Sequence, residues 1–351
     1  MNYFRDMAAD EGRAGSVPAA PTATLADVAR AAGVSMATAS KALNGRPQVA
    51  PTTRRRVEEA AAELSFTPNF FARALNSART GSVGVVTSEL DHRFVVPIVR
   101  GAEEALDAAG LSVLLADTRD DPDRERSHVR SLLARRVDGL LVVGRTTNPR
   151  PPVADVGDVP VVYAYAPSTG EADASSTPDN VAAGRLAAEH LIARGRTRIA
   201  LVNGESSYAA ARERAEGVVA ALAAHGLEPV GGSALYGQWG EAWGRDCARL
   251  LVRGGDAVDG IIGGSDHIAR GVLDTLRDEG RDVPGDVAVI GFDDWDLLVR
   301  EARPPLSSVA MELERLGRTA AQRLVDMIGG ATVAGVTREP VRVVARASTG
   351  A

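Results

Sequence analysis

Apolar runs and amphipathic stretches alternate along most of the chain from residue 81 onward. Short apolar runs stand at 82–87, 111–116 and 139–143, and amphipathic stretches at 94–109 and 122–136 separate them. Apolar runs of this length are typical of buried strands, and a strand–helix–strand rhythm predicts a parallel sheet with helices on both faces. We therefore expect an α/β domain in this part of the chain.

The same alternation begins again in the second half. An amphipathic stretch at 179–194 precedes an apolar run at 199–203, and further helix–strand pairs continue to an apolar run at 287–292. The segment Ala-Leu-Asp-Ala-Ala-Gly-Leu from Ala105 is echoed by Ala-Leu-Ala-Ala-His-Gly-Leu from Ala221, which favours two similar lobes. Two such lobes leave a cleft at the carboxyl ends of their strands, where open sheets usually bind ligands.

A denser pattern occupies the chain before residue 65. Apolar residues recur there at every third or fourth position and predict three short helices, over 25–32, 36–43 and 51–64. Thr24 and Ser35 can cap the first two helices, and Gly33 ends the first of them. Pro51 suits the first turn of the third helix. Two helices joined by a short glycine-containing turn form a helix-turn-helix, whose second helix can enter the major groove of DNA.

The outer face of the second helix carries small and basic side chains, because Met36, Ala37, Ser40 and Lys41 lie opposite the apolar face. Ala37 can touch a thymine methyl group, and Lys41 can reach guanine acceptors or a phosphate. Met36 taken alone also suits a core position, and the basic run Arg54–Arg56 also suits an ordinary solvated face.

Charge is divided unevenly along the chain. Residues 23–80 hold eight Lys and Arg against four Asp and Glu, whereas the whole chain has a net charge of −6. A basic module on an acidic body fits local, salt-dependent affinity for DNA. The stretch 69–76 predicts a helix too short to be stable alone, and the Ala, Pro, Gly and Ser content of residues 1–22 predicts a disordered tail.

Three segments in this region resemble the lactose-repressor (LacI/GalR) family of bacterial transcription regulators. They are Thr-Leu-Ala-Asp-Val-Ala-Arg-Ala-Ala-Gly-Val-Ser from Thr24, Ala-Leu-Asn-Gly from Ala42 and Pro-Asn-Phe-Phe-Ala-Arg-Ala-Leu from Pro68. The resemblance implies a hinge helix that folds on DNA and a leucine, here Leu75, that wedges into the minor groove. The resemblance also implies that Met36, Ala37 and Lys41 read the bases. The residues expected to contact DNA are Thr24, Ser35, Met36, Ala37, Thr38, Ser40, Lys41, Asn44, Arg54, Asn69, Arg73 and Leu75.

The resemblance covers most of residues 24–349 and implies a regulatory domain like a periplasmic sugar-binding protein. The expected fold is α/β, with an N-terminal helix-turn-helix domain followed by a two-lobed, doubly wound effector domain. The expected divisions are a tail at 1–22, a DNA-binding domain at 23–67, a hinge helix and linker at 68–80 and an effector-binding and dimerisation domain at 81–351. Within the last, the N-lobe is expected over about 81–176 and 311–340, and the C-lobe over about 177–309 and 341–351.

Polar and aromatic residues near strand ends are the candidates for binding an effector. Sugars are bound by planar groups that pair with adjacent hydroxyls and by flat apolar rings. The resemblance implies that Arg214 and Asp293 bind the effector and that Trp239 lines the sugar site. The expected effector-binding residues are Arg214, Asp293, Trp239, Asp266, Ser265, Tyr165, Asp91 and Arg212.

Several of these residues also have purely structural interpretations. Ser265 and Asp266 can cap the helix that follows them, Arg212 can pair with Glu216 four residues on, and Trp295 suits core packing as well as ligand contact. The segment 89–95, Glu-Leu-Asp-His-Arg-Phe-Val, departs from the family pattern. Possible specificity residues are therefore Tyr163, Tyr165, Asp91, His92 and Arg93.

These observations predict a sequence-specific DNA-binding regulator, a repressor, whose operator affinity is controlled by a sugar bound between the lobes. A corepressor-type regulator that binds a purine is the alternative. A doubly wound enzyme is a distant alternative, because no phosphate-binding glycine motif follows a strand and no His/Cys cluster has metal-ligand spacing. No catalytic residue, metal or cofactor is expected.

The expected partners are double-stranded DNA with a near-palindromic operator, a small-molecule effector and a second copy of the chain in a homodimer. A single cysteine, Cys247, indicates a reducing cytoplasm, where the protein would associate with the nucleoid. No run of eighteen apolar residues predicts a membrane span. Nothing after Arg346 resembles a heptad tail, so a tetramer is not expected.

Overall fold

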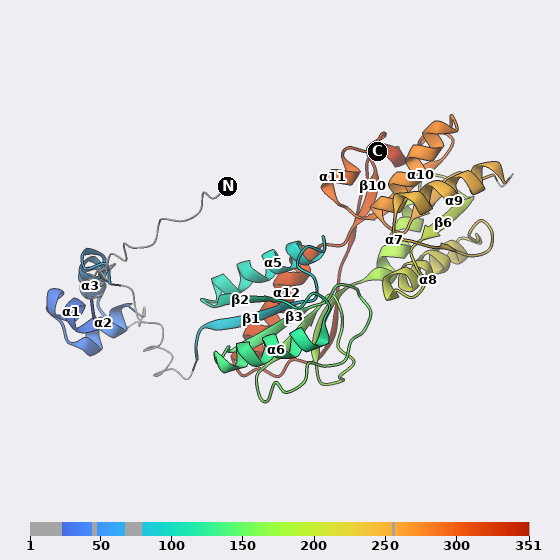
Figure 1. Cartoon of the computed structure of the whole chain (residues 1–351). Coiled ribbons are helices and arrows are strands. Elements are labelled where there is room, and N and C mark those ends of the chain that lie inside the picture. The colour runs from blue at the N-terminus through green and yellow to red at the C-terminus, as the bar shows by residue number, and fades with distance from the viewer. Residues whose placement is uncertain (1–22, 44–47, 67–78, 255–256, 351) are drawn as a thin grey trace, which may run out of the picture. The chain divides into compact units, whose positions relative to one another are not determined.

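The computed structural model describes residues 23–43, 48–66, 79–254 and 257–350 (Figure 1). The chain divides into two compact units, Met1–Ala78 and Arg79–Ala351. Several predictions lie outside the described residues and stay predictions: the disordered tail over 1–22, the hinge helix over 69–76, and the DNA contacts of Asn44, Asn69, Arg73 and Leu75.

The described part of the first unit contains α1 (Leu25–Ala31), α2 (Met36–Leu43) and α3 (Pro51–Glu63). Thr24 begins α1 with a capping box: its hydroxyl accepts from the amide of Asp27 at 3.3 Å, and its own amide donates to the Asp27 carboxylate at 3.0 Å. Ser35 accepts from the amide of Thr38 at 3.1 Å and so caps α2. The helix limits agree with the sequence prediction to within one residue.

Small apolar side chains hold these three helices together. Val28, Ala39 and Val57 come one from each helix and are fully buried. The remaining buried members of this core are Ala29, Ala32, Ala42, Val49, Ala60 and Ala61. Because alanine and valine dominate, the helices pack closely around a small core, and polar side chains are left on the outer face of α2.

The second unit consists of two lobes, each a six-stranded sheet between layers of helices. The N-lobe sheet has the order β11-β5-β4-β3-β1-β2, and all its pairs are parallel. Its strands are β1 (Ser82–Thr87), β2 (Ser112–Asp117), β3 (Gly139–Val143), β4 (Val161–Ala164), β5 (Ala174–Pro178) and β11 (Gly335–Glu339). Its helices are α5 (Val95–Ala108), α6 (Pro122–Ala134) and α12 (Leu313–Ile328).

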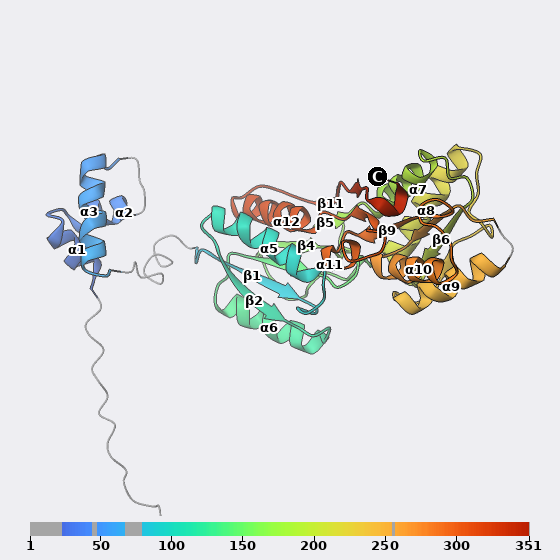
Figure 2. The same ribbon diagram turned by 90° about the horizontal axis from the view of Figure 1, so that it is seen from above.

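Alternation along the N-lobe strands sends side chains to two separate cores. Val85 and Leu141 pack on one face against α5 and α12, which lie side by side (Figure 2). Val86 and Leu140 pack on the other face against α6. Both faces are therefore buried, as expected of a parallel sheet.

The C-lobe sheet has the order β12-β10-β9-β8-β6-β7, and only the β10–β12 pair is antiparallel. Its strands are β6 (Ile199–Asn203), β7 (Leu235–Tyr236), β8 (Gly260–Gly263), β9 (Ala288–Asp293), β10 (Ser307–Ala310) and β12 (Arg342–Val344). Its helices are α7 (Asn180–Ile192), α8 (Ala209–Ala224), α9 (Glu241–Arg253), α10 (Asp266–Asp278), α11 (Asp296–Val299) and the 3₁₀ turn η1 (Ala347–Thr349). Helices α7 and α8 pack on one face, and α9 and α10 on the other.

The chain passes between the lobes three times. The crossings lie between β5 and α7, between β10 and α12, and between β11 and β12. As a result α12, which comes late in the sequence, packs against α5 in the N-lobe. The crossings bring the carboxyl ends of both sets of strands toward one cleft, and this places the candidate site. Among the described residues, no helix is long and apolar enough to span a membrane.

Candidate functional site

A cavity lies in the cleft between the two lobes. Its volume is about 210 Å³. Its lining comes from both lobes and comprises His92, Arg93, Phe94, Arg145, Thr146, Thr147, Tyr165, Tyr208, Ala210, Arg214, Trp239 and Asp293. Four of the eight expected effector residues, Arg214, Asp293, Trp239 and Tyr165, are among them.

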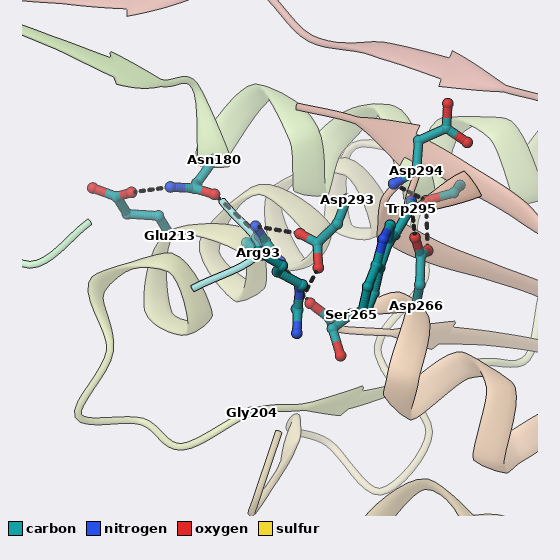
Figure 3. Close-up of polar contacts among 12 residues, drawn as sticks. Arg93, Asn180, Gly204, Glu213, Ser265, Asp266, Asp293, Asp294 and Trp295 are labelled. Carbon is teal, nitrogen blue, oxygen red and sulfur yellow. Dashed lines mark hydrogen bonds and ion pairs between the residues drawn. The ribbon is translucent and has the colours of Figure 1, made fainter. Parts of the chain in front are cut away.

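Asp293 lines this cavity at the end of β9. One carboxylate oxygen accepts from Arg93 of the N-lobe at 2.9 Å (Figure 3). The other lies 3.5 Å from Nη2 of Arg214 of the C-lobe. The backbone at Asp293 has φ 102°, a conformation that side chains other than glycine rarely adopt. Such local strain is found at functional sites, where the surrounding structure compensates for it.

Three contacts hold the guanidinium of Arg214 in place. Its Nε donates to the Oδ1 of Asn180 at 3.1 Å, and its Nη1 donates to the carbonyl oxygen of Gly264 at 2.6 Å. Its guanidinium lies 4.8 Å from the ring centroid of Phe292. Asn180 in turn donates to Glu213 at 3.0 Å. These bonds fix the direction in which Arg214 presents its remaining N–H groups to the cavity.

Aromatic rings form much of the wall. Phe94 and Tyr165 are 5.4 Å apart between centroids, and Tyr208 meets Trp239 edge to face at 5.7 Å. Burial raises the pKa of Tyr165 well above its ordinary value, so its phenol stays protonated at neutral pH. These rings offer flat apolar surface next to the charged groups at Asp293, the combination that suits a sugar ring.

Tyr163 does not reach the cavity, although it is only two positions from Tyr165. It is buried in the core under α6, where its hydroxyl accepts from the amide of Val153 at 2.9 Å. Residues two apart share a face only while a strand continues, and β4 ends at Ala164. Tyr165 follows with φ 73°, so the alternation breaks there and the two rings diverge.

Ser265 and Asp266 lie beneath the cleft and do not line the cavity. Ser265 caps α10 by accepting from the amide of Ile268 at 3.3 Å, so its capping interpretation holds. Asp266 is buried, and its oxygens accept from the Ser308 hydroxyl at 2.6 Å and from the Trp295 amide at 2.8 Å (Figure 3). Burial, with the nearby charge of Asp293, raises the pKa of Asp266 well above its ordinary value. Asp266 therefore positions the loop that follows Asp293.

Asp91 and Arg212 also lie off the cavity. Asp91 is exposed in the loop after β1. Arg212 donates from Nη1 to the carbonyl oxygen of Ser206 at 2.6 Å and lines a separate cavity with Glu216. The expected ion pair between Arg212 and Glu216 is not formed, since the guanidinium turns back to the loop before α8.

Some cavity residues were not anticipated from the sequence. The three residues after Gly144, which follows the end of β3, are Arg145, Thr146 and Thr147. The strand-end argument used for Asp293 could have identified them. Arg145 lies 3.7 Å from Glu89 and 3.2 Å from Asp120. The sequence around Asn180 gave no indication that its side chain binds Arg214. That contact depends on where the chain crosses between the lobes and begins α7.

The candidate DNA-contacting face is the outer side of α2. Met36 is 57% exposed, which excludes the core interpretation of this residue. Ala37 and Lys41 are also exposed, and Thr38 and Ser40 are half-buried. Arg54 lies half-buried on α3, where Arg55 and Arg56 are exposed.

Two family models match the chain. The model described as bacterial regulatory proteins, lacI family, matches residues 24–69, and the one described as periplasmic binding protein-like domain matches residues 188–349. The HTH-type transcriptional regulator CelR of Thermobifida fusca is 37% identical over 329 residues, which cover 92% of this chain and 95% of that protein. The ribose operon repressor of Escherichia coli strain K12 is 33% identical over 309 residues, which cover 87% of this chain and 93% of that protein.

Solved structures give the same result. A lac repressor dimer bound to operator and the anti-inducer ONPF matches with a TM-score of 0.73 and 29% identity, over 94% of this chain and 99% of that one. A complex of the transcriptional regulator CelR with cellobiose matches with a TM-score of 0.64 and 32% identity, over 93% of this chain and 99% of that one. The predicted fold class, a helix-turn-helix followed by a two-lobed effector domain, is thereby confirmed.

Proposed function

The chain belongs to the lacI family of bacterial regulatory proteins, and from that premise we propose which groups of this DNA-binding regulator bind its effector. The effector is a carbohydrate held between the lobes by Arg214, Asp293, Trp239 and Tyr165. The DNA contacts are made by the residues predicted from the sequence, which are Thr24, Ser35, Met36, Ala37, Thr38, Ser40, Lys41, Asn44 and Arg54, with hinge contacts from Asn69, Arg73 and Leu75.

One observation carries the effector proposal: a carboxylate, two guanidiniums and aromatic rings from both lobes converge on one cavity. Each carboxylate oxygen has about two acceptor sites, so Asp293 can bind both arginines and still accept from a sugar hydroxyl. The CelR structure was solved with cellobiose, and a second relative is named for a ribose operon. Both names support the carbohydrate class.

The quaternary state and the cellular location belong to the same proposal. A homodimer would present two copies of α2 to successive major grooves, which matches a near-palindromic operator. The lac repressor relative is a dimer on its operator. Such a protein acts in the cytoplasm, on the nucleoid. We also propose the domain boundaries predicted from the sequence, which lie near residues 22, 67 and 80 and between the two lobes.

The experiment is a paired titration of the full chain. Thermal shift against a panel of mono- and disaccharides identifies the ligand, and fluorescence anisotropy with an inverted-repeat DNA selected from a random pool measures operator binding. A ligand at about one hundred times its Kd should stabilise the native state by roughly 2.7 kcal/mol. Asp293→Asn should abolish this stabilisation and leave DNA affinity without ligand unchanged.

Asp278→Asn is the matched control, because Asp278 is an exposed aspartate of the same lobe. It should retain both activities. A panel in which no carbohydrate stabilises the protein would overturn the effector proposal, and equal losses of ligand and DNA binding in Asp293→Asn would overturn the separation of the two sites.

A further inference from the structure

Four residues that line the cavity each carry a buried polar atom with no hydrogen-bond partner. The atoms are Nε of Arg93, Nε1 of Trp239, Oγ1 of Thr147 and Nδ1 of His92. A buried polar group without a partner costs about 1–3 kcal/mol, and native proteins hold few of them. Four such groups beside one cavity, contributed by both lobes, favour a polar ligand that forms hydrogen bonds with them.

These atoms are mainly hydrogen-bond donors. Arg93 Nε and Trp239 Nε1 can only donate, and the Thr147 hydroxyl can donate. Burial first, and then the positive charge of Arg93, lowers the pKa of His92, so its ring is neutral at pH 7. A ligand that satisfies this cavity must therefore be rich in acceptors.

Two guanidiniums of the cavity lining share one carboxylate. Arg93 and Arg214 share the single carboxylate of Asp293, which leaves one surplus positive charge. Asp293 is 4% exposed, Arg214 3% and Arg93 24%. Among the described residues neither arginine pairs with a second carboxylate, so an additional anion is favoured beside them. The carboxylates of Glu89 and Asp120 bind Arg145 in a more exposed position.

Two aromatic rings flank the guanidinium of Arg93. The group lies 4.3 Å from the ring centroid of Phe94 and 5.4 Å from that of Trp295. Nη2 donates to Asp293 through one of its two hydrogens, while Nε has no partner. Nε and Nη2 form one edge of the guanidinium, and a carboxylate that accepts from both makes the paired geometry that arginine favours.

We propose that the effector is an acidic carbohydrate, a uronate or aldonate, whose carboxylate is bound by Arg93. The proposal rests on the proposed function, because it names the ligand class for the same cavity. The hydroxyls of such a ligand accept from Trp239 and Thr147 and donate to Asp293. Arg93 is in this way the residue that separates acidic from neutral sugars.

The test is isothermal titration of the full chain with three acid and neutral pairs. D-glucuronate and D-gluconate are compared with D-glucose, and D-galacturonate with D-galactose. At least one acid should bind about tenfold or more tightly than its neutral partner, since pairing a buried charge is worth that much or more. The preference should weaken as NaCl concentration rises, because screening acts on charge.

Three variants make the test specific. Arg93→Gln should remove the preference for the acid, Arg93→Lys should keep part of it because the charge remains, and Arg126→Gln, at an exposed arginine of α6, should leave it unchanged. If Arg93→Gln and the unaltered chain bind the acid equally tightly, the proposal is overturned. Acid binding by Arg93→Lys shows that a site substituted at this position still folds.

The other outcomes separate the two proposals. A neutral sugar that binds as tightly as its acid would overturn the acidic ligand and leave the carbohydrate function standing. If none of these five compounds binds, and no carbohydrate of the wider panel binds either, both the acidic-ligand proposal and the carbohydrate proposal are overturned.

Discussion

Gly184 on α7 faces the backbone of Arg214 on α8, so closely that a Cβ atom on Gly184 would lie 2.0 Å from the Arg214 carbonyl oxygen. The contact is reciprocated one turn away, where a Cβ on Gly217 would lie 2.0 Å from the carbonyl oxygen of Val181. Real Cβ atoms do not approach backbone oxygens this closely, so both glycines are required for the two helices to touch. This contact also keeps Arg214 within reach of Asn180, which begins α7.

Gly184→Ala should therefore affect both stability and ligand binding. The added methyl forces α7 and α8 apart at a cost of about 1–3 kcal/mol, and it moves Arg214 from its bond to Asn180. We expect a lower midpoint in urea denaturation and weaker binding of the effector. Gly240→Ala is the control, because a Cβ at Gly240 meets no atom within 4 Å. A Gly184→Ala protein with unchanged ligand affinity would show that this helix contact does not position Arg214.

Thr24→Ala should destabilise the first unit alone. The substitution removes the side-chain half of the capping box with Asp27, and loss of such a cap costs about 1 kcal/mol. Operator affinity should fall while effector affinity is unchanged, because the two units are separate. Anisotropy with operator DNA and calorimetry with effector measure the two. Thr52→Ala, at an exposed position on α3, serves as the control and should change neither.

Lys41 is the only lysine in the sequence and is exposed on α2, which allows a chemical test of the DNA-contacting face. An amine-reactive acetylating reagent can modify only Lys41 and the N-terminal amine. We expect operator DNA to protect Lys41 from acetylation, and acetylated protein to lose operator affinity while it keeps effector affinity. Lys41→Arg retains the charge and should bind DNA after the same treatment. Equal acetylation rates with and without DNA would remove Lys41 from the interface.

Periodicity was sufficient to predict the elements and the two lobes. The three helices at 25–64 and the strands at 82–87, 139–143 and 199–203 carry local signals of capping and apolar spacing, and the structure places each within about one residue. The exposed side of α2 followed from the same spacing. These features depend on neighbours in the sequence, which is why the sequence reveals them.

The cavity was only partly predictable, because its lining depends on contacts between distant residues. Arg93 and Asp293 are 200 positions apart, and their pairing across the lobes has no local signature. Ser265 and Asp266 occupy strand-end positions as Asp293 does, but the helix that starts immediately after β8 turns them into the protein. Tyr163 was misassigned because it lies within β4 and faces the core under α6, whereas the backbone turns at Tyr165 and sends only that ring to the cavity.

His190 makes the stability of the C-lobe sensitive to pH. Its Nδ1 lies 3.2 Å from Nη1 of Arg194, and its Nε2 lies 2.9 Å from the hydroxyl of Thr349. Arginine can only donate, so Nδ1 must accept and the ring must be neutral, with Nε2 donating to Thr349. Burial, followed by the charge of Arg194, lowers the pKa of His190 to about 4.

The folded pKa lies below the ordinary value of about 6.5, so the unfolded chain binds the proton first as pH falls. The stability that neutral His190 provides is complete above pH 6.5 and is lost progressively between about pH 6.5 and pH 4, with a slope of up to about 1.4 kcal/mol per pH unit. Urea denaturation at several pH values should show this loss. His190→Gln should reduce the slope in that window, and His92 and His267, whose pKa values burial also lowers, account for a remaining part. His128→Gln, on α6 of the other lobe, should leave the slope unchanged. An identical pH dependence in His190→Gln and the unaltered protein would assign the acid sensitivity to other groups.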